Sequence, residues 1–381
     1  MFVNRRRRLF LIITALSVLF VSIRLTSSPR AAGEPIPAQL SDEAFWNMVT
    51  EFSETGGYFR SDNFVSNETT FQYVIKDLKK TTPGGVYLGV GPDQNFTYIV
   101  ALQPKIAIIF DIRKQNAMQH LMYKALIETS ADRAEFLSKL FSRKRPESLG
   151  SKSTPEEPFA AYENIEADRQ LFQETLQGIK KQLEETHKFK LSPDDEGTIE
   201  YVLRAFYAGG PDLTYNGIGS GNFGRGRMPS YGELMQATDA VGANLSYMGS
   251  EENFKALQDL EKKNLIIPVV GDFAGPKAIR TVARYLKDHD AFVTAFYLSN
   301  VEQYLFQQDD DWSKFYRNVA TLPLDSSATF IRSIFNGIPP TYQPAGNALR
   351  SASVLSSIPE LLRAFGAGEV RTYSDVINMS K

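Results

Sequence analysis

Two neighbouring apolar segments constrain the fold of this chain more than any other feature. The first, Val86-Tyr-Leu-Gly-Val-Gly-Pro92, carries the pair Gly89 and Gly91, and the second, Lys105-Ile-Ala-Ile-Ile-Phe-Asp111, ends in an acid. Each predicts a buried strand, and the pattern of Asn95 to Leu102 between them predicts a helix. Glycine tolerates positive φ and lets the backbone pass close to a ligand. An acid at the tip of the next strand can accept two hydrogen bonds from a ribose diol, so the segment predicts the core of a nucleotide- or nucleoside-binding α/β unit.

The same alternation of helices and strands continues along the chain. Helices are predicted at residues 42–53, 70–80, 115–128 and 275–287, and further strands at 266–272, 291–300 and 328–335. This order is typical of an α/β fold with a largely parallel sheet and right-handed crossovers. We therefore predict a Rossmann-like domain made of two parts, residues 41–140 and 265–381.

Residues 141–264 predict a helical insertion between these two parts. Its helices are expected at 162–188, at 193–207 behind the N-cap Ser192, and at 251–263. The glycine-rich stretch Gly209 to Pro229 is long for a loop without structure of its own, and such loops tend to be functional or disordered. Tyr215, Phe223 and Arg225 give it stacking and anion-binding capacity. It is either a lid over a pocket or a mobile surface loop.

The first thirty residues predict a membrane anchor. Arg5 to Arg8 precede an uncharged run, Leu9 to Ile23, and Arg24 and Arg30 follow it. A signal peptide is the alternative, but Arg30 stands where cleavage after Ala32 would prefer a small residue. The excess of arginine before the run places the N-terminus in the cytoplasm and the body outside it. Residues 31–40 would form a tether, and cleavage would instead give a secreted protein.

Composition excludes several classes of function. The chain has no cysteine, which removes disulfides and thiolate chemistry, and its three histidines are too scattered for a metal site. The whole chain has a formal charge of −2, and the six arginines of residues 1–30 contribute +6, so the rest carries −8. An acidic body of this kind is not expected to bind nucleic acid.

Four of the predicted strands end in glycine or polar residues. These are Gly89 and Gly91, Asp111, Asp272, and Ser299 with Asn300. In a parallel sheet the carboxyl ends of the strands share one edge, where ligands bind at the point at which the strand order reverses. We therefore expect these groups to converge on one site.

This arrangement resembles the class I S-adenosylmethionine-dependent methyltransferases. Gly89-Val-Gly91-Pro92 is similar to the first motif of that family, and Asp111 to the acid that holds the ribose. Gly271-Asp272 resembles the pair beside the adenine, and Tyr297-Leu-Ser-Asn300 the motif that faces the methyl group. Residues 131–145 and 267–306 also resemble an uncharacterised bacterial family of anchored proteins.

The resemblance implies a set of roles. S-adenosylmethionine would be held by Gly89, Gly91, Asp111 and Asp272. The acceptor would be held by Tyr297, Ser299, Asn300, Tyr215, Phe223 and Arg225. Catalysis would rest mainly on proximity and orientation. The chain departs from the family at Leu88, where an acid is usual.

Two other functions stay open. An extracytoplasmic body would lie apart from the cytoplasmic source of S-adenosylmethionine, so the second hypothesis is a non-catalytic ligand-binding or scaffold module. The acidic run Asp309 to Asp311 suggests a third, a metal-dependent type II membrane glycosyltransferase. A surface turn is the simpler interpretation of that run.

Overall fold

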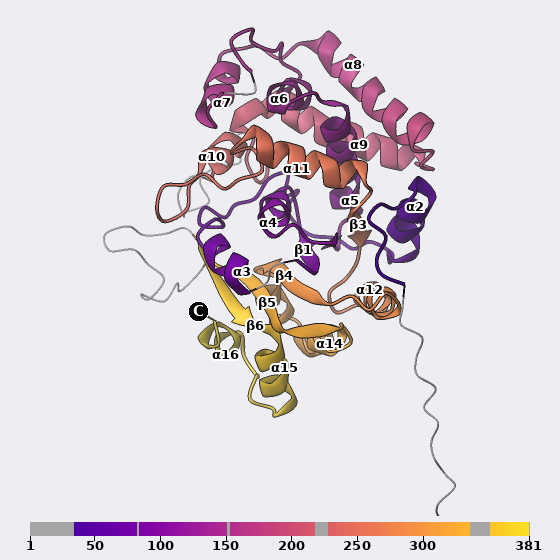
Figure 1. Cartoon of the computed structure of the whole chain (residues 1–381), viewed down its shortest axis with the longest axis vertical. Helices are drawn as coiled ribbons and strands as arrows, with labels where there is room; N and C mark the ends of the chain where they lie inside the picture. The colour runs from indigo at the N-terminus through magenta and orange to yellow at the C-terminus, as the bar shows by residue number, and fades with distance from the viewer. Residues whose placement is uncertain (1–33, 82–83, 151–152, 218–227, 336–350, 381) are drawn as a thin grey trace, which may run out of the picture. The chain divides into compact units, whose positions relative to one another are not determined.

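One six-stranded sheet organises the computed structural model, which describes residues 34–81, 84–150, 153–217, 228–335 and 351–380. The strands are β1 (Val86–Val90), β2 (Ile106–Asp111), β3 (Ile266–Val270), β4 (Val293–Ser299), β5 (Leu324–Ile334) and β6 (Ala352–Ser357), in the spatial order β3-β2-β1-β4-β5-β6. All neighbours are parallel except β5 and β6 (Figure 1). The strand order reverses between β1 and β4, so the expected ligand site lies at the carboxyl ends of these two strands.

The central strands are apolar because both faces of the sheet are covered. Every residue of β1, β2 and β3 is buried, which explains their uninterrupted hydrophobic sequences. Pro268 lies in β3, at the end of the sheet, where a missing N–H disrupts no second ladder. The predicted α/β class with a largely parallel sheet is therefore confirmed, and the strand order is consistent with a Rossmann-like fold.

Helices flank the sheet and fill the chain between β2 and β3. Before and between the first strands lie α2 (Asp42–Glu51), α3 (Ile75–Thr81) and α4 (Gln94–Leu102). Between β2 and β3 lie α5 (Lys114–Thr129), α6 (Arg133–Phe141), α7 (Glu156–Glu163), α8 (Arg169–Lys180), the π-helical η1 (Lys181–Thr186), α9 (Pro193–Gly209), the short 3-10 turn η2 (Gly210–Asp212), α10 (Tyr231–Gln236) and α11 (Glu251–Lys262). The rest are α12 (Ala278–Asp288), α13 (Val301–Leu305), α14 (Asp311–Val319), α15 (Ile358–Gly366) and α16 (Tyr373–Asn378).

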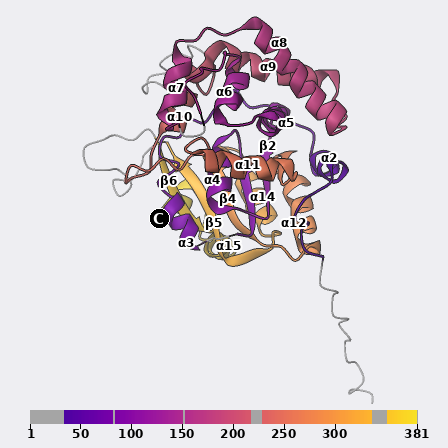
Figure 2. The ribbon, with the colours of Figure 1, turned by 45° about the horizontal axis from the view of Figure 1, so that its top comes forward.

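The helices between β2 and β3 form a layer of their own. In both views α6 to α9 lie at the end opposite α12 and α15 (Figures 1 and 2). They are joined to the sheet through α5, which packs against α9, β2 and β3. From Pro35 onward the chain forms one compact unit, so this layer is part of the same body as the sheet.

Several elements differ from the sequence predictions. The helix expected at 162–188 is interrupted, because Asp168 caps a new helix by accepting hydrogen bonds from the N–H groups of Gln170 and Leu171. The serine-rich strand β6 and the helix α6 were not predicted. None of the helices within the described ranges is long and apolar enough to cross a membrane. The anchor expected at residues 1–30 lies outside those ranges.

Candidate functional site

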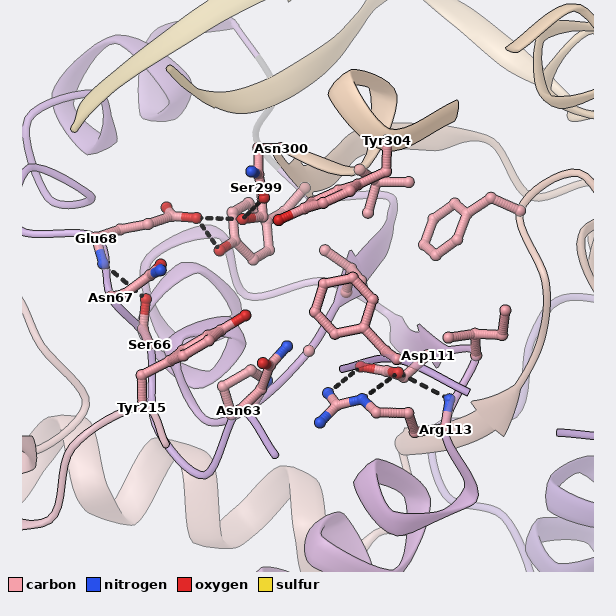
Figure 3. Close-up of a pocket in the computed structure, with 18 of the residues that line it drawn as sticks. Asn63, Ser66, Asn67, Glu68, Asp111, Arg113, Tyr215, Ser299, Asn300 and Tyr304 are labelled. Atoms are coloured by element: carbon pink, nitrogen blue, oxygen red, sulfur yellow. Dashed lines mark hydrogen bonds and ion pairs between the residues drawn. The ribbon is translucent and has the colours of Figure 1, made fainter. Parts of the chain in front are cut away.

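A pocket lies at the carboxyl ends of the central strands (Figure 3). Seven of the residues singled out by sequence line it, namely Gly91, Asp111, Asp272, Tyr297, Ser299, Asn300 and Tyr215. Gly89 does not line it, and Phe223 and Arg225 lie outside the described residues. The parallel sheet thus brings together positions that span more than half of the sequence.

The two glycines after β1 serve different purposes. Gly91 has φ of +77° and open space where a side chain would begin, so it is required for the turn itself. Gly89 is a packing position, because a Cβ there would lie 1.9 Å from the Oδ1 atom of Asn95. Asn95 Nδ2 donates hydrogen bonds to the carbonyl oxygens of Val90, Gly91 and Pro92. Asn95, which the sequence patterns did not single out, therefore holds the turn in shape.

A buried polar cluster supports the same turn from behind. His120 Nε2 lies 2.9 Å from the carbonyl oxygen of Gly91, and burial lowers the pKa of His120 to about 4, so the ring is neutral and donates to that oxygen. Asp93 accepts a hydrogen bond from the Tyr247 hydroxyl, and burial raises the pKa of Asp93 to about 7. These groups face the protein interior and position the backbone that lines the pocket.

Asp111 is already bound by a neighbouring cation. Arg113 makes a bidentate ion pair with it, Nε to Oδ1 at 3.0 Å and Nη2 to Oδ2 at 2.7 Å, and the Arg113 backbone N–H also donates to Oδ1. Both side chains are buried. Oδ2 accepts only one of these three hydrogen bonds. It could therefore accept a further hydrogen bond from a ribose diol while Arg113 stays in place.

The wall opposite the sheet comes from residues 53–70, which we call the edge segment. It crosses the carboxyl ends of the strands: the N–H of Glu54 donates to Val270 of β3, and that of Gly57 to Ile112 after β2. Arg113 Nη1 donates to the carbonyl oxygens of Ser61 and Asp62 and so fastens the segment to the sheet. The edge segment therefore forms a fixed side of the pocket.

Glu68 is the main site residue that the sequence did not reveal. Its Oε1 accepts hydrogen bonds from Tyr297 at 2.8 Å and Ser299 at 2.5 Å, and its Oε2 accepts one from Gln94 at 2.8 Å. Ser299 has φ of +51°, a conformation that is uncommon for a residue with a Cβ and that concentrates at functional sites. The signal available in the sequence, a Ser-Asn-Glu run before a helix, gives no hint of this contact.

The remaining predicted residues, Asp272, Tyr215 and Asn300, also line the pocket. Asp272 is half-buried; burial raises its pKa, and nearby Asp311 and Glu54 add to the effect. Tyr215 comes from the start of the glycine-rich stretch and faces the pocket from the side opposite Tyr304 (Figure 3). Asn300 follows Ser299 at the end of β4.

The pocket is acidic and aromatic. Among the described residues, the lining contains three carboxylates, Glu68, Asp111 and Asp272, against one guanidinium, that of Arg113, which gives these residues a formal charge of −2. Its rings are those of Phe59, Tyr215, Phe273, Tyr297 and Tyr304. Such a lining favours cationic or hydroxyl-rich ligands over phosphates, since aromatic faces and carboxylates both attract positive charge.

The acidic run considered for a metal site does not line this pocket, although Asp311 lies near enough to Asp272 to raise its pKa. Asp310 and Asp311 each form an ion pair with Lys314 at the start of α14, at 2.7 and 2.9 Å. In the part of the chain that the structure describes, no group of three or more acids and histidines is arranged to hold a metal ion. The run is a surface turn.

Comparison with known proteins identifies a family for this chain but no activity. No curated protein matches this chain. A family model described as "Domain of unknown function (DUF7790)" matches residues 63–203 and 220–352, a range that includes Glu68, the β1 turn, Asp111 and the end of β4. Because the match covers more than half of the sequence, the chain belongs to the DUF7790 family.

Proposed function

We propose that this protein is methyltransferase-like and binds an S-adenosyl nucleoside in the pocket at the carboxyl edge of the sheet. The observation that carries the proposal is the convergence of the β1 turn at Gly91, of Asp111 and of Asp272 on one cavity. These positions follow β1, β2 and β3, the three strands on one side of the switch point. The acceptor would lie beside Ser299 and Asn300, at the end of β4.

One further observation supports this ligand over a dinucleotide or a nucleotide sugar. The formal charge of −2 in the lining disfavours a pyrophosphate and favours a sulfonium.

Calorimetric titration with S-adenosylhomocysteine tests the proposal. We expect the full-length protein to bind, and the conservative variant Asp111→Asn to bind about tenfold more weakly, since a charge-assisted hydrogen bond to a ribose hydroxyl is lost. Asn keeps a hydrogen-bond acceptor for Arg113, which also keeps its bonds to the carbonyl oxygens of Ser61 and Asp62, so the variant is expected to fold with reduced stability. Circular dichroism and thermal melting verify this for each variant.

The matched control is Asp309→Asn, which removes one exposed acid outside the pocket. It should bind like the wild type. It also examines the glycosyltransferase alternative, because a metal-dependent activity that disappears in this variant would contradict our proposal. Absence of binding to the folded wild type would leave the pocket to another ligand and favour a non-catalytic scaffold.

We also propose that residues 1–30 anchor the protein with its body outside the cytoplasm. The arginines before the apolar run support this orientation. Alkaline phosphatase and green fluorescent protein fused after Lys381 give opposite readouts. Phosphatase activity supports an external body, whereas fluorescence alone would reverse the orientation and place the pocket beside the cytoplasmic pool of S-adenosylmethionine.

A further inference from the structure

Glu68 is a buried carboxyl group with no ion-pair partner among the residues that the structure describes. Only 1% of the residue is exposed. Its three side-chain partners, Tyr297, Ser299 and Gln94, are neutral donors. Within the described ranges no lysine, arginine or histidine forms an ion pair with it. Buried charges in proteins are normally paired, so a cationic group on a ligand in this pocket would supply the partner that the described residues do not.

Asp111, another acid of the pocket, differs from Glu68 because it has a counter-ion. Asp111 and Arg113 neutralise each other through their bidentate contact. Figure 3 shows Glu68 and Ser299 on one side of the pocket and the Asp111–Arg113 pair on the other. Beside β2 the pocket is therefore neutralised, and its formal charge of −2 comes from Asp272 after β3 and from Glu68, which forms the negative end beside β4.

Local geometry fixes the negative end in place. Ser299 keeps its unusual φ of +51° while its hydroxyl lies 2.5 Å from Glu68, so the hydrogen bond is maintained against backbone strain. Aromatic rings line the same pocket, and the Tyr304 ring is itself held edge-on by Phe59 at 5.2 Å. Aromatic faces beside a carboxylate are a common arrangement for binding sulfonium and ammonium groups.

We propose that Glu68 makes this pocket selective for a cationic ligand, and that it contacts the sulfonium of the S-adenosyl nucleoside. The second part rests on the function proposed above. With the ribose at Asp111 on the β2 side, the sulfonium would extend toward β4, where Glu68 lies. Glu68 is thus a specificity-determining residue that distinguishes the charged methyl donor from the uncharged thioether left after transfer.

The test compares two ligands that differ only in the methyl group on sulfur and in the positive charge that this group brings. S-adenosylmethionine carries a sulfonium and S-adenosylhomocysteine a neutral thioether, whereas the amino acid and nucleoside parts are the same. Titrations with both ligands give the ratio of Kd for the thioether to Kd for the sulfonium. We expect this ratio to fall about tenfold in Glu68→Gln, because the variant keeps the size of the side chain and loses its charge.

Asp272→Asn is the matched control, because it removes the same charge from the β3 side of the same pocket. It should change both affinities in the same proportion and leave the ratio unchanged. Ser299→Gly, which releases the orienting hydrogen bond without removing the charge, should lower the ratio by a smaller factor. It keeps the test decisive should Glu68→Gln not fold.

The failure of this inference is distinct from the failure of the proposed function. An unchanged ratio in a folded Glu68→Gln would overturn the sulfonium assignment. If both affinities fall by the same factor, the contact is with the ammonium common to both ligands. If neither affinity changes, Glu68 does not contact the ligand. If neither ligand binds the folded wild type, the proposed function itself fails.

Discussion

At the scale of single residues, the two glycines of the β1 turn give the sharpest contrast. Gly89→Ala places a Cβ 1.9 Å from Asn95 Oδ1, so Asn95 must leave the three carbonyl groups that it binds. We expect a loss of about 3 kcal/mol in the free energy of unfolding from overpacking and stranded polar groups. Gly91→Ala meets no atom and should cost only about 1–2 kcal/mol for its positive φ. Urea denaturation of both variants measures the difference, and equal losses would contradict the packing role of Gly89.

The Asp111–Arg113 pair leads to a second prediction. Arg113→Met leaves the buried carboxylate of Asp111 without its counter-ion and releases the carbonyl groups of Ser61 and Asp62. Removing one partner of a buried ion pair typically costs about 3–5 kcal/mol. The double variant Asp111→Asn/Arg113→Met, which leaves no buried charge, should recover part of that loss. A double variant no more stable than Arg113→Met alone would show that the anchoring of the edge segment dominates instead.

The residues of the site differ in how far the sequence could reveal them. Gly91, Asp111, Asp272 and Ser299 each follow an apolar run, so strand periodicity alone predicts that they share an edge. Glu68 has no such marker, because it reaches the site through the path of the edge segment over the strand ends. Contacts of that kind depend on the tertiary course of the chain, which local patterns do not encode.

At the scale of elements, caps and apolar periodicity were sufficient for most helices and strands. The sequence Ser192-Pro-Asp-Asp predicts a helix start, and the structure has a capping box there at the beginning of α9. Strand β6 has no comparable signal, because it is an edge strand whose buried residues alternate with partly exposed serines. The glycine-rich stretch after Tyr215 predicts only a loop, and whether it is a lid stays a prediction.

A buried charge network joins four elements and makes stability depend on pH. His187, next to η1, lies 2.7 Å from Asp42 of α2 and 2.6 Å from Glu128 of α5, which also binds Lys124. Burial by itself would lower the pKa of His187, but the hydrogen bonds and charges of Glu128 and Asp42 outweigh it and raise that pKa. Glu261 of α11 lies beside Lys124, and burial raises the pKa of Glu261 to about 8.

We therefore expect His187→Gln to destabilise the protein most at acidic to neutral pH. A histidine whose pKa is raised by folding stabilises the folded state fully below its unfolded pKa of about 6.5 and loses this contribution as pH rises through the folded value. The difference in Tm between wild type and variant should thus be larger at pH 6 than at pH 9. Glu261 also titrates between these two pH values, so the same comparison with Glu261→Gln gives its contribution to the pH dependence of Tm. A difference in Tm that does not change with pH would indicate that His187 contributes hydrogen bonds and packing only.

At the scale of the whole molecule, the pocket depends on chain far from the strands that predicted it. The edge segment forms one wall and is held by Val270, Ile112 and Arg113, while α2 packs against β3 just before it. Residues 35–70 are therefore structural parts of the sheet domain. The alternation of helices and strands already predicts that residues 41–70 belong to this domain, whereas it predicts a tether for residues 35–40.

Truncation separates the anchor from the folded body. The unit from Pro35 to Lys381 is compact by itself, so a fragment that begins at Pro35 should keep the Tm of the full-length protein. A fragment that begins at Thr70 lacks Glu68, the carbonyl groups of Ser61 and Asp62 that Arg113 binds, and the buried Phe45 and Phe64, so it should not reach a stable fold. Thermal melting and proteolysis of both fragments measure this. A Thr70 fragment with native stability would mean that the domain folds without the edge segment. The contribution of that segment to the pocket would then have to be measured from ligand affinity.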